Sequence, residues 1–182
     1  MRSAFAAMFV LTVAVPVRAT VLIGADLGQL AHDAVAIARG RVAAVDTQWT
    51  PDRRAIETLV TLEVDTYLKG ALGGTVQFLV PGGSLGRYRS IVVGAPQFAV
   101  DDRVVVFLGA RGPSVPYVVG FSQGVFRVVR SGDGSTWLVT PPAPMPSAAP
   151  VPVTIVRGDP QRRPLPLNDF EQRVRALAGG AR

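Results

Sequence analysis

The sequence of 182 residues contains no cysteine and only one histidine, His32. The absence of cysteine excludes disulfide bridges, cysteine-ligated zinc and thiol nucleophiles, and a single histidine excludes every site that needs two. Charged residues make up only 18% of the chain, and no hydrophobic run reaches the ~20 residues that a membrane-spanning helix needs. We therefore expect one modest domain with appendages, no metal and no cofactor.

The basic residues are numerous but are spread along the chain. The net charge is +6, yet eleven basic and ten acidic residues nearly cancel between Thr20 and Thr140. The excess lies in residues 1–19 and in the tail from Val151 onward. Because nucleic-acid binding requires basic side chains gathered on one face of a domain, we do not expect a nucleic acid as partner.

Residues 1–19 have the pattern of a secretory signal peptide. Arg2 supplies a positive start, residues 4–15 are almost all apolar, and Ala19 provides a small side chain at the cleavage position. The apolar run is shorter than a bilayer-spanning helix, so an uncleaved membrane anchor is only the alternative. The pattern predicts a secreted or periplasmic protein that begins at Thr20 and has no transmembrane anchor after cleavage.

Strand patterns recur through residues 20–140. The clearest alternation covers residues 56–64, where apolar side chains occupy every second position. Residues 104–108 are apolar throughout, which predicts a strand buried on both faces. Gly40 interrupts the run at residues 36–45 and is typical of a bulge. Further strands are predicted at residues 76–80, 88–93, 117–121, 125–129 and 137–139. This series predicts a mainly β protein built as an antiparallel barrel or sandwich.

Two short helices are predicted at the ends of the mature chain. Asp26 and Gln29 have the spacing of a capped helix start, and Asn168 and Glu171 repeat it near the C-terminus. The C-terminal helix carries one apolar stripe, which predicts that it docks on the barrel. The stripe consists of Leu167, Phe170, Val174 and Leu177. The pair at residues 179–180, both glycines, is expected to end this helix.

Proline sets the domain boundaries. Six prolines lie between residues 141 and 152, and they predict an extended connector because proline lacks the backbone N–H that a central strand needs. The predicted organisation is a signal peptide at 1–19, a barrel domain at 20–140 and a Pro-rich connector at 141–153. A C-terminal segment at 154–182 follows, and its helix docks on the barrel.

A glycine-rich loop follows the strand at residues 76–80. It consists of Pro81, Gly82, Gly83, Ser84, Leu85 and Gly86. Its last five residues match the G-x-S-x-G pattern of a hydrolase, in which a strand-to-helix turn exposes the serine. Here a strand pattern follows, and His32 precedes the serine although that fold places the histidine last. An ordinary loop is the favoured interpretation, and a secreted hydrolase that uses Ser84 is the alternative.

Several short motifs, in this order and spacing, resemble a widespread family of secreted bacterial proteins whose activity is uncharacterised. The motifs are Asp26-Leu27-Gly28-Gln29-Leu30, Ile37-Ala38-Arg39-Gly40-Arg41-Val42, Trp49, Tyr67-Leu68-Lys69-Gly70, Pro81-Gly82-Gly83, Gly94-Ala95-Pro96-Gln97-Phe98, Val105-Val106-Phe107-Leu108 and Gly124-Val125-Phe126-Arg127-Val128. Together they cover the chain from about Asp26 to Val129. The resemblance implies export but no particular activity.

Residues 34–70 are more distantly similar to the netrin-like domain of tissue inhibitors of metalloproteinases, an OB-type barrel. The resemblance implies an OB-like β-barrel and, as a partner, a secreted metalloprotease. Those inhibitors coordinate the protease zinc through an N-terminal cysteine, where this chain has Thr20. Contact would then come from the free α-amine, from the apolar side chains beside it and from the loop at residues 81–86. The candidate binding residues are Thr20, Val21, Leu22 and Ile23 together with the six loop residues.

These observations predict an exported, non-enzymatic binding module that acts on a protein or cell-envelope partner. The hydrolase built on Ser84 is one alternative, and a purely structural envelope protein is another.

Overall fold

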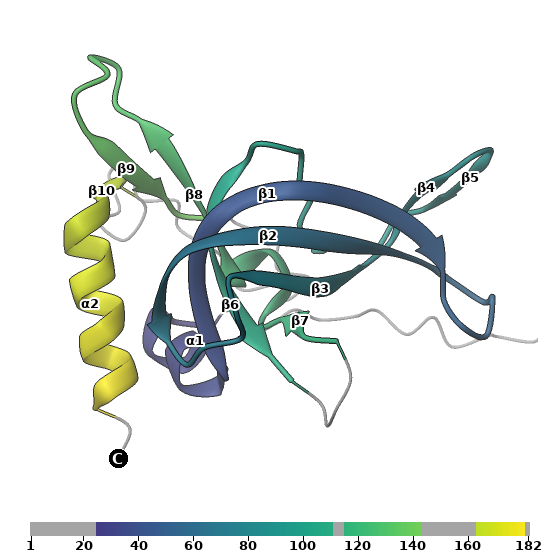
Figure 1. Ribbon diagram of the computed structural model, residues 1–182, viewed down its shortest axis with the longest axis horizontal. Coiled ribbons are helices and arrows are strands. Elements are labelled where there is room, and N and C mark those ends of the chain that lie inside the picture. The colour runs from purple at the N-terminus through teal and green to yellow at the C-terminus, as the bar shows by residue number, and fades with distance from the viewer. Residues whose placement is uncertain (1–24, 111–114, 143–162, 181–182) are drawn as a thin grey trace, which may run out of the picture.

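The computed structural model describes residues 25–110, 115–142 and 163–180. Strands predominate in these residues and a short helix lies near each end, which confirms the prediction of a mainly β fold (Figure 1). In chain order the elements are α1 (Leu27–Asp33), β1 (Ala36–Trp49), β2 (Ile56–Lys69), β3 (Thr75–Pro81), β4 (Gly83–Leu85), β5 (Tyr88–Ser90), β6 (Arg103–Gly109), β7 (Tyr117–Val118), the 3₁₀ helix η1 (Phe121–Gly124), β8 (Val125–Arg130), β9 (Trp137–Thr140), β10 (Leu165–Pro166) and α2 (Leu167–Gly179).

Five strands pair in a closed ring. β1 pairs with β2, β2 with β3, β3 with β7, β7 with β6, and β6 pairs back with β1. All of these pairings are antiparallel except the one between β3 and β7. The predicted antiparallel arrangement is therefore wrong at this pairing, because a ring with an odd number of strands cannot alternate in direction throughout. β8, β9 and β10 extend the sheet outward from β6.

The bulge predicted at Gly40 is confirmed. The register between β1 and β2 shifts between Arg39 and Gly40. A Cβ atom at Gly40 would lie 2.1 Å from the backbone oxygen of Glu63. Glycine is needed here because the two strands approach too closely for any side chain, and this lets β1 bend around the ring.

Strand β6 separates two hydrophobic cores. Val104, Val106 and Leu108 pack among the strands of the ring. Val105 and Phe107 point the other way, into a core shared with both helices. All five side chains are fully buried, which confirms the prediction that this strand is buried on both faces. Ile37 of β1 and Leu68 of β2 enter this second core as well, so three neighbouring strands of the ring pack against the helices.

Helix α1 begins as the sequence predicts. The side chain of Asp26 accepts a hydrogen bond from the backbone N–H of Gln29 at 2.8 Å. At the other end, the Lys69 ammonium donates to the carbonyl oxygens of Ala31 and His32. A cation at the C-terminal end of a helix stabilises carbonyl groups that have no partner within the helix.

Helix α2 differs from its prediction at the start. It begins at Leu167 after Pro166, and no side chain caps it, so the predicted capping by Asn168 is wrong. The physical reason is that Leu165 and Pro166 pair with β9 as a short strand, and the helix starts directly where that pairing ends. Three members of the predicted stripe (Leu167, Phe170 and Val174) are buried, whereas Leu177 is exposed.

Three other predictions differ from the structure. Residues 83–85 were expected in a loop but form β4, which pairs with β5 as a hairpin, and two predicted strands are shorter than expected. The strand predicted at residues 88–93 ends at Ser90, since a turn closed by the hydrogen bond from Ala95 to Val92 follows. The strand predicted at residues 117–121 ends at Val118, because Gly120 adopts a left-handed conformation and starts η1.

Some predictions fall outside the described residues. These are the signal peptide at 1–19, the candidate binding residues at 20–23 and most of the connector at 141–153. None of the helices within residues 25–110, 115–142 and 163–180 is long and apolar enough to cross a membrane.

Candidate functional site

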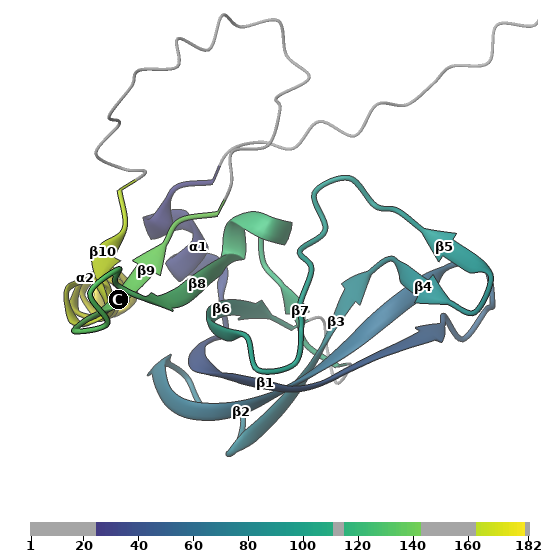
Figure 2. The same ribbon diagram turned by 90° about the horizontal axis from the view of Figure 1, so that it is seen from above.

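A hollow of about 340 Å³ lies at the end of the ring that carries the β4–β5 hairpin. The hairpin and the chain after it run back over the ends of β1, β2 and β3 (Figure 2). The hollow is lined by Val45, Thr47, Thr58, Val80, Pro81, Gly82, Gly83, Ser84, Arg89, Ser90, Ile91, Val92, Ala95, Pro96, Gln97 and Phe98. Its wall is mixed in character, since hydroxyl, amide and guanidinium groups lie among apolar side chains.

The predicted loop at residues 81–84, which forms the end of β3 and the start of β4, is fixed on β2 by hydrogen bonds. The backbone N–H of Gly82 donates to the carbonyl of Ile56 at 2.8 Å, and the Thr58 hydroxyl donates to the carbonyl of Gly82 at 2.7 Å. Gly83 then passes so close to the strands that a Cβ atom would lie 2.6 Å from the hydroxyl oxygen of Thr58 and 2.7 Å from a methyl of Thr47. Glycine thus allows the loop to lie directly against β1 and β2.

The inner end of the hollow is closed by aromatic packing. Phe98 meets Phe78 edge to face, with ring centroids 5.4 Å apart. Ala95 and Phe98 both pack against the core of the ring. The hollow therefore borders the core of the ring at Ala95 and Phe98.

The structure brings together part of the predicted site. Four of the predicted loop residues line the hollow, whereas Leu85 and Gly86 lie at the turn of the hairpin and do not. The candidates Thr20, Val21, Leu22 and Ile23 are outside the described part of the chain. The loop is thus placed at a surface that can receive a ligand, and its predicted meeting with the N-terminal residues stays a prediction.

The serine of the G-x-S-x-G pattern lies on a strand. Ser84 is exposed in β4, and the next element is β5, not the helix of a nucleophile turn. His32 lies in α1 and is absent from the lining of the hollow. Among the described residues, no three His, Asp or Glu side chains lie close enough together to hold a metal ion.

Exposed apolar side chains surround the mouth of the hollow. Ile91 is 74% exposed and Val93 is 77% exposed, and Val92 lies between them. Tyr88 and Trp49 are also exposed and meet edge to face, with ring centroids 5.3 Å apart. This contact joins the hairpin to the end of β1. We call the hollow together with these five side chains the hairpin end.

Three exposed arginines beside these apolar residues have no carboxylate partner. Arg53, Arg87 and Arg89 form no ion pair within the described part of the chain. The Arg87 guanidinium instead lies 5.0 Å from the centre of the Tyr88 ring and donates to its hydroxyl. These cations are available to an external anion.

The neighbouring carboxylate of Asp52 is engaged within its own turn. The Thr50 hydroxyl and then the backbone N–H of Arg54 donate to it, and both lower its pKa below the ordinary value. The Arg54 guanidinium lies 3.8 Å from the same carboxylate. Asp52 therefore stays charged and is bound locally, without reaching the arginines of the hairpin.

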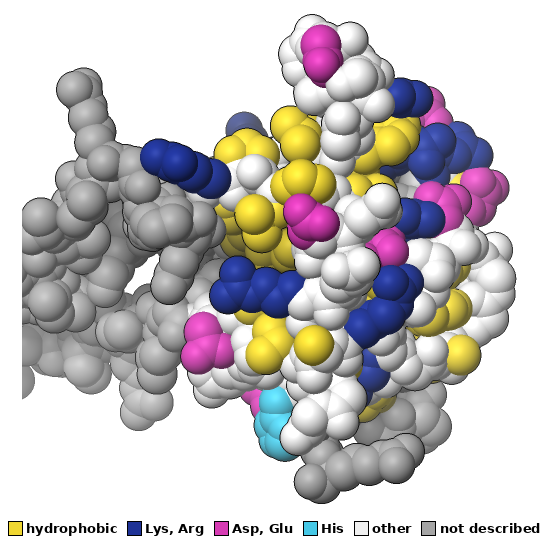
Figure 3. All heavy atoms as spheres, turned by 90° about the vertical axis from the view of Figure 1, so that its left-hand side faces the viewer, with side chains coloured by type: hydrophobic (Ala, Val, Ile, Leu, Met, Phe, Trp, Pro, Cys, Tyr) yellow, Lys and Arg dark blue, Asp and Glu magenta, His cyan; other side chains and the backbone are white. Residues whose placement is uncertain are grey.

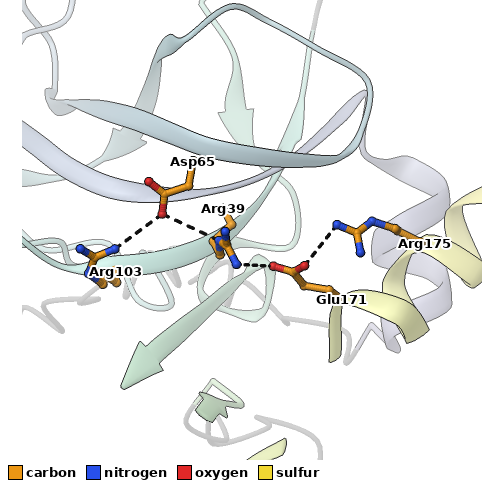
Figure 4. Close-up of polar contacts among 5 residues, drawn as sticks. All are labelled: Arg39, Asp65, Arg103, Glu171 and Arg175. Atoms are coloured by element: carbon orange, nitrogen blue, oxygen red, sulfur yellow. Dashed lines mark hydrogen bonds and ion pairs between the residues drawn. The ribbon is translucent and has the colours of Figure 1, made fainter. Parts of the chain in front are cut away.

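The opposite end of the molecule carries a network of charges that the sequence analysis did not predict. Arg39 of β1 donates to Glu171 of α2 at 2.7 Å, and Arg175 donates to the other oxygen of Glu171 at 3.1 Å (Figure 4). Asp65 lies 3.8 Å from Arg39 and 3.6 Å from Arg103. The Glu171 side chain is only 9% exposed. The network links α2 to the ring.

This network borders a second hollow of about 320 Å³. The hollow is lined by Arg39, Asp65, Arg103, Val128, Trp137, Leu167 and Asn168. The guanidinium of Arg130 lies 4.1 Å from the centre of the Trp137 ring, and that of Arg103 lies 5.4 Å from it. Some Lys and Arg side chains on this face of the molecule lie beside Asp and Glu side chains, and others stand apart from them (Figure 3). Arg39, Arg103 and Arg130 are thus engaged by groups of the protein itself.

Two further arginines also have carboxylate partners within the fold. Arg41 donates to Asp101 and to Glu63, each at 2.6 Å, and these hydrogen bonds, first the one to Asp101 and then the one to Glu63, raise the pKa of Arg41. Arg127 binds Asp102 at 2.6 Å. Away from the hairpin end, these arginines are therefore neutralised in place.

Sequence reasoning missed the apolar and basic residues of the hairpin end. The run Ile91, Val92 and Val93 has the composition of a strand, and the sequence predicts one at residues 88–93. The available signal was its surroundings, because Gly94 and Pro96 end the run and arginines precede it. Nothing local indicated the pair between Arg39 and Glu171, which lie 132 positions apart.

Comparison of the chain with protein-family models, with curated proteins and with solved structures finds no match.

Proposed function

We propose that this protein is an exported, non-enzymatic binding module, and that the hairpin end attaches it to a component of the cell envelope. The observation that carries the proposal is the distribution of exposed apolar side chains. Eleven large hydrophobic residues are exposed in the described part of the chain, and five of them belong to the hairpin end. A concentration of apolar surface beside unpaired cations is typical of an interaction site.

The ring supports the proposal as a scaffold. We propose that its five strands form an OB-like barrel, a fold whose open face and end loops commonly bind ligands. The loop at residues 81–84 is anchored on β2 by two hydrogen bonds, so the hairpin end is held by rigid strands. Such anchoring reduces the entropy lost on binding.

The non-enzymatic part of the proposal rests on the surroundings of Ser84. An activated serine needs a base within hydrogen-bond reach and a third group that orients the base. The only histidine lies in α1, and no described residue donates to or accepts from the Ser84 hydroxyl. The hydrolase alternative would require Ser84→Ala to abolish a measurable turnover, whereas our proposal expects no effect of this substitution on any hydrolytic assay.

Export follows from the predicted signal peptide at residues 1–19 and agrees with a chain that lacks cysteine. An inhibitor of a secreted metalloprotease would also need residues 20–23 against the protease. Our proposal uses the hairpin end alone and does not depend on those residues.

The test is sedimentation of the purified protein with isolated cell envelopes. We expect the protein to sediment with the envelopes and the variant Tyr88→Ser to lose at least most of this binding. The matched control is Val129→Ser, at a side chain that is 42% exposed on β8. Binding that both variants retain would show that the hairpin end is not the attachment surface, and absence of binding would favour a role without an envelope partner.

A further inference from the structure

We infer that the partner of the hairpin end is the surface of an anionic lipid bilayer. This inference rests on the proposed function and names its partner. The apolar side chains of the hairpin end would enter the boundary between headgroups and acyl chains, and the free arginines would contact the anionic headgroups.

The shape of the hairpin end fits a planar surface. The β4–β5 hairpin projects at one end of the molecule, beside the turn between β1 and β2, in both views (Figures 1 and 2). The most exposed apolar side chains, Ile91 and Val93, follow directly after this hairpin. A projecting apolar edge can enter a bilayer interface without a complementary cavity, whereas a protein partner would need one.

The aromatic residues fit the same surface. Trp49 and Tyr88 are in contact and each is more than one third exposed. Their rings combine an apolar body with a polar N–H or O–H group, and this combination favours the headgroup level of a bilayer. Tyr88 lies between Arg87 and Arg89 in the hairpin, so an aromatic ring and two cations occupy adjacent positions.

The charges at this end favour an anionic surface. Arg53, Arg87 and Arg89 are exposed and without ion pairs in the described residues. Of the nearby acids, Asp52 is paired with the Arg54 guanidinium at 3.8 Å, and the three free arginines outnumber the remaining two, Glu57 and Asp46. Asp46, which is exposed, lies farther back along β1.

The first experiment measures binding of the full chain to vesicles by sedimentation. We expect strong binding to vesicles made of equal parts phosphatidylglycerol and phosphatidylcholine, and little binding to phosphatidylcholine alone. Binding should weaken as the salt concentration rises, because salt screens the arginines. Equal binding to both kinds of vesicle, or binding to neither, would overturn the inference.

Two double variants test the residues. Arg87→Ser with Arg89→Ser should weaken binding to the anionic vesicles about 25-fold, since each basic residue near such a surface contributes about fivefold. The matched control is Arg163→Ser with Arg173→Ser, at two exposed arginines without ion pairs at the other end.

The second double variant tests the apolar side chains. Ile91→Ser with Val93→Ser should abolish binding to the anionic vesicles. Its control is Val100→Ser with Val129→Ser, at side chains 54% and 42% exposed.

The two tryptophans provide a second readout that does not depend on the hairpin variants. Trp49 lies at the hairpin end and Trp137 at the other end. The variant Trp137→Phe keeps only Trp49, and its fluorescence should shift to shorter wavelength on anionic vesicles. The variant Trp49→Phe keeps only Trp137, whose fluorescence should not change. A shift of Trp137 alone would place the contact at the wrong end and overturn the inference.

The vesicle experiment tests the lipid inference, and the envelope experiment tests the proposed function, so the two can fail independently. A protein that binds isolated envelopes through the hairpin end, but no anionic vesicle, would have an acidic protein as its partner. Protease treatment of the envelopes would then remove the binding. That result would overturn the lipid inference and leave the proposed function intact.

Discussion

The arginines that contact Glu171 at one end of the molecule and the arginines of the hairpin at the other have opposite roles. At the end that carries α2, Arg39 and Arg175 hold the buried carboxylate of Glu171 between them. At the hairpin end, Arg87 and Arg89 face solvent beside exposed apolar side chains. The first two arginines bind a carboxylate of the fold, and the other two are free to bind an anion outside the protein.

The difference separates residues that stabilise the fold from residues that can serve binding. A buried carboxylate whose partner is removed lacks compensation for its lost hydration, so the free energy of unfolding falls. Replacing an exposed arginine that has no partner leaves no buried charge uncompensated, so the free energy of unfolding changes little. Substitutions at the α2 end should therefore reduce stability, and substitutions at the hairpin end should reduce binding alone.

The largest effect is expected from Phe170→Ala. Phe170 is 3% exposed and its ring centre lies 4.9 Å from that of Phe126. Removing the ring leaves a cavity between α2 and the sheet, and the free energy of unfolding should fall by about 3 to 4 kcal/mol. Urea unfolding measures this change. The control is Leu177→Ala on the same helix, at a side chain 37% exposed, which should cost under about 1 kcal/mol. Equal losses would show that α2 is not docked through Phe170.

The next effect tests the charge network. Glu171→Gln removes the charge that faces Arg39 and Arg175, and we expect a loss of about 2 kcal/mol, since the Arg39 side chain is still partly solvated. Glu63→Gln is the matched control, because it removes a carboxylate that is 53% exposed and paired with Arg41; it should cost about 0.5 kcal/mol. The same urea measurement applies. If the control costs more than Glu171→Gln, the contrast between buried and exposed pairs does not hold.

A smaller effect on stability is expected at the hairpin end. Ile91→Ser with Val93→Ser should change the free energy of unfolding by less than about 0.5 kcal/mol, because both side chains are mostly exposed and bury little surface in the fold. Thermal and urea unfolding should both agree with the unsubstituted protein. A loss of more than about 2 kcal/mol would mean that these side chains belong to the core, and the distinction between the two ends would fail.

The smallest effect concerns the turn between β8 and β9. Hydrogen bonds from the Ser131 hydroxyl, then from the backbone N–H and the hydroxyl of Ser135, lower the pKa of Asp133 from 3.8 to about 2. Because the folded-state pKa is lowered, this stabilisation is complete above about pH 4 and is lost as the pH falls through about 2. A titration followed by NMR should show the Asp133 carboxyl shifting near pH 2 in the native protein. A midpoint near 3.8 would mean that the turn does not hold the carboxylate.

The comparison also explains how far sequence reasoning could reach. Residues 91–93 and residues 104–106 have nearly the same composition, Ile-Val-Val and Val-Val-Val. The second run is fully buried on both faces of β6, whereas the first is exposed after β5. Periodicity identifies a strand but does not specify which neighbours cover it, because covering depends on chain segments that are distant in sequence. The hairpin end could therefore not be predicted from its own residues.

Local signals predicted local features correctly. The cap of α1 at Asp26 and the bulge at Gly40 both depend on a few neighbouring atoms. The start of α2 was predicted wrongly because the pairing of Leu165 with β9 competes with a side-chain cap at Asn168. The ion pair between Arg39 and Glu171 joins the first strand to the last helix, and no pattern within a window of residues can indicate it.

The closing of the ring has a consequence for the order in which the chain folds. β1, β2 and β3 are consecutive antiparallel strands, so they can pair through short turns. Ile37, however, pairs with Phe107, and the segment between them contains β2 to β5. Joining these distant residues requires a large loss of chain entropy before any new contact offsets it, which makes this step slow. Until it is complete, residues 36–41 present an unpaired strand edge that another copy of the chain can bind. Closure of the ring is therefore also the step that protects the folding protein from aggregation.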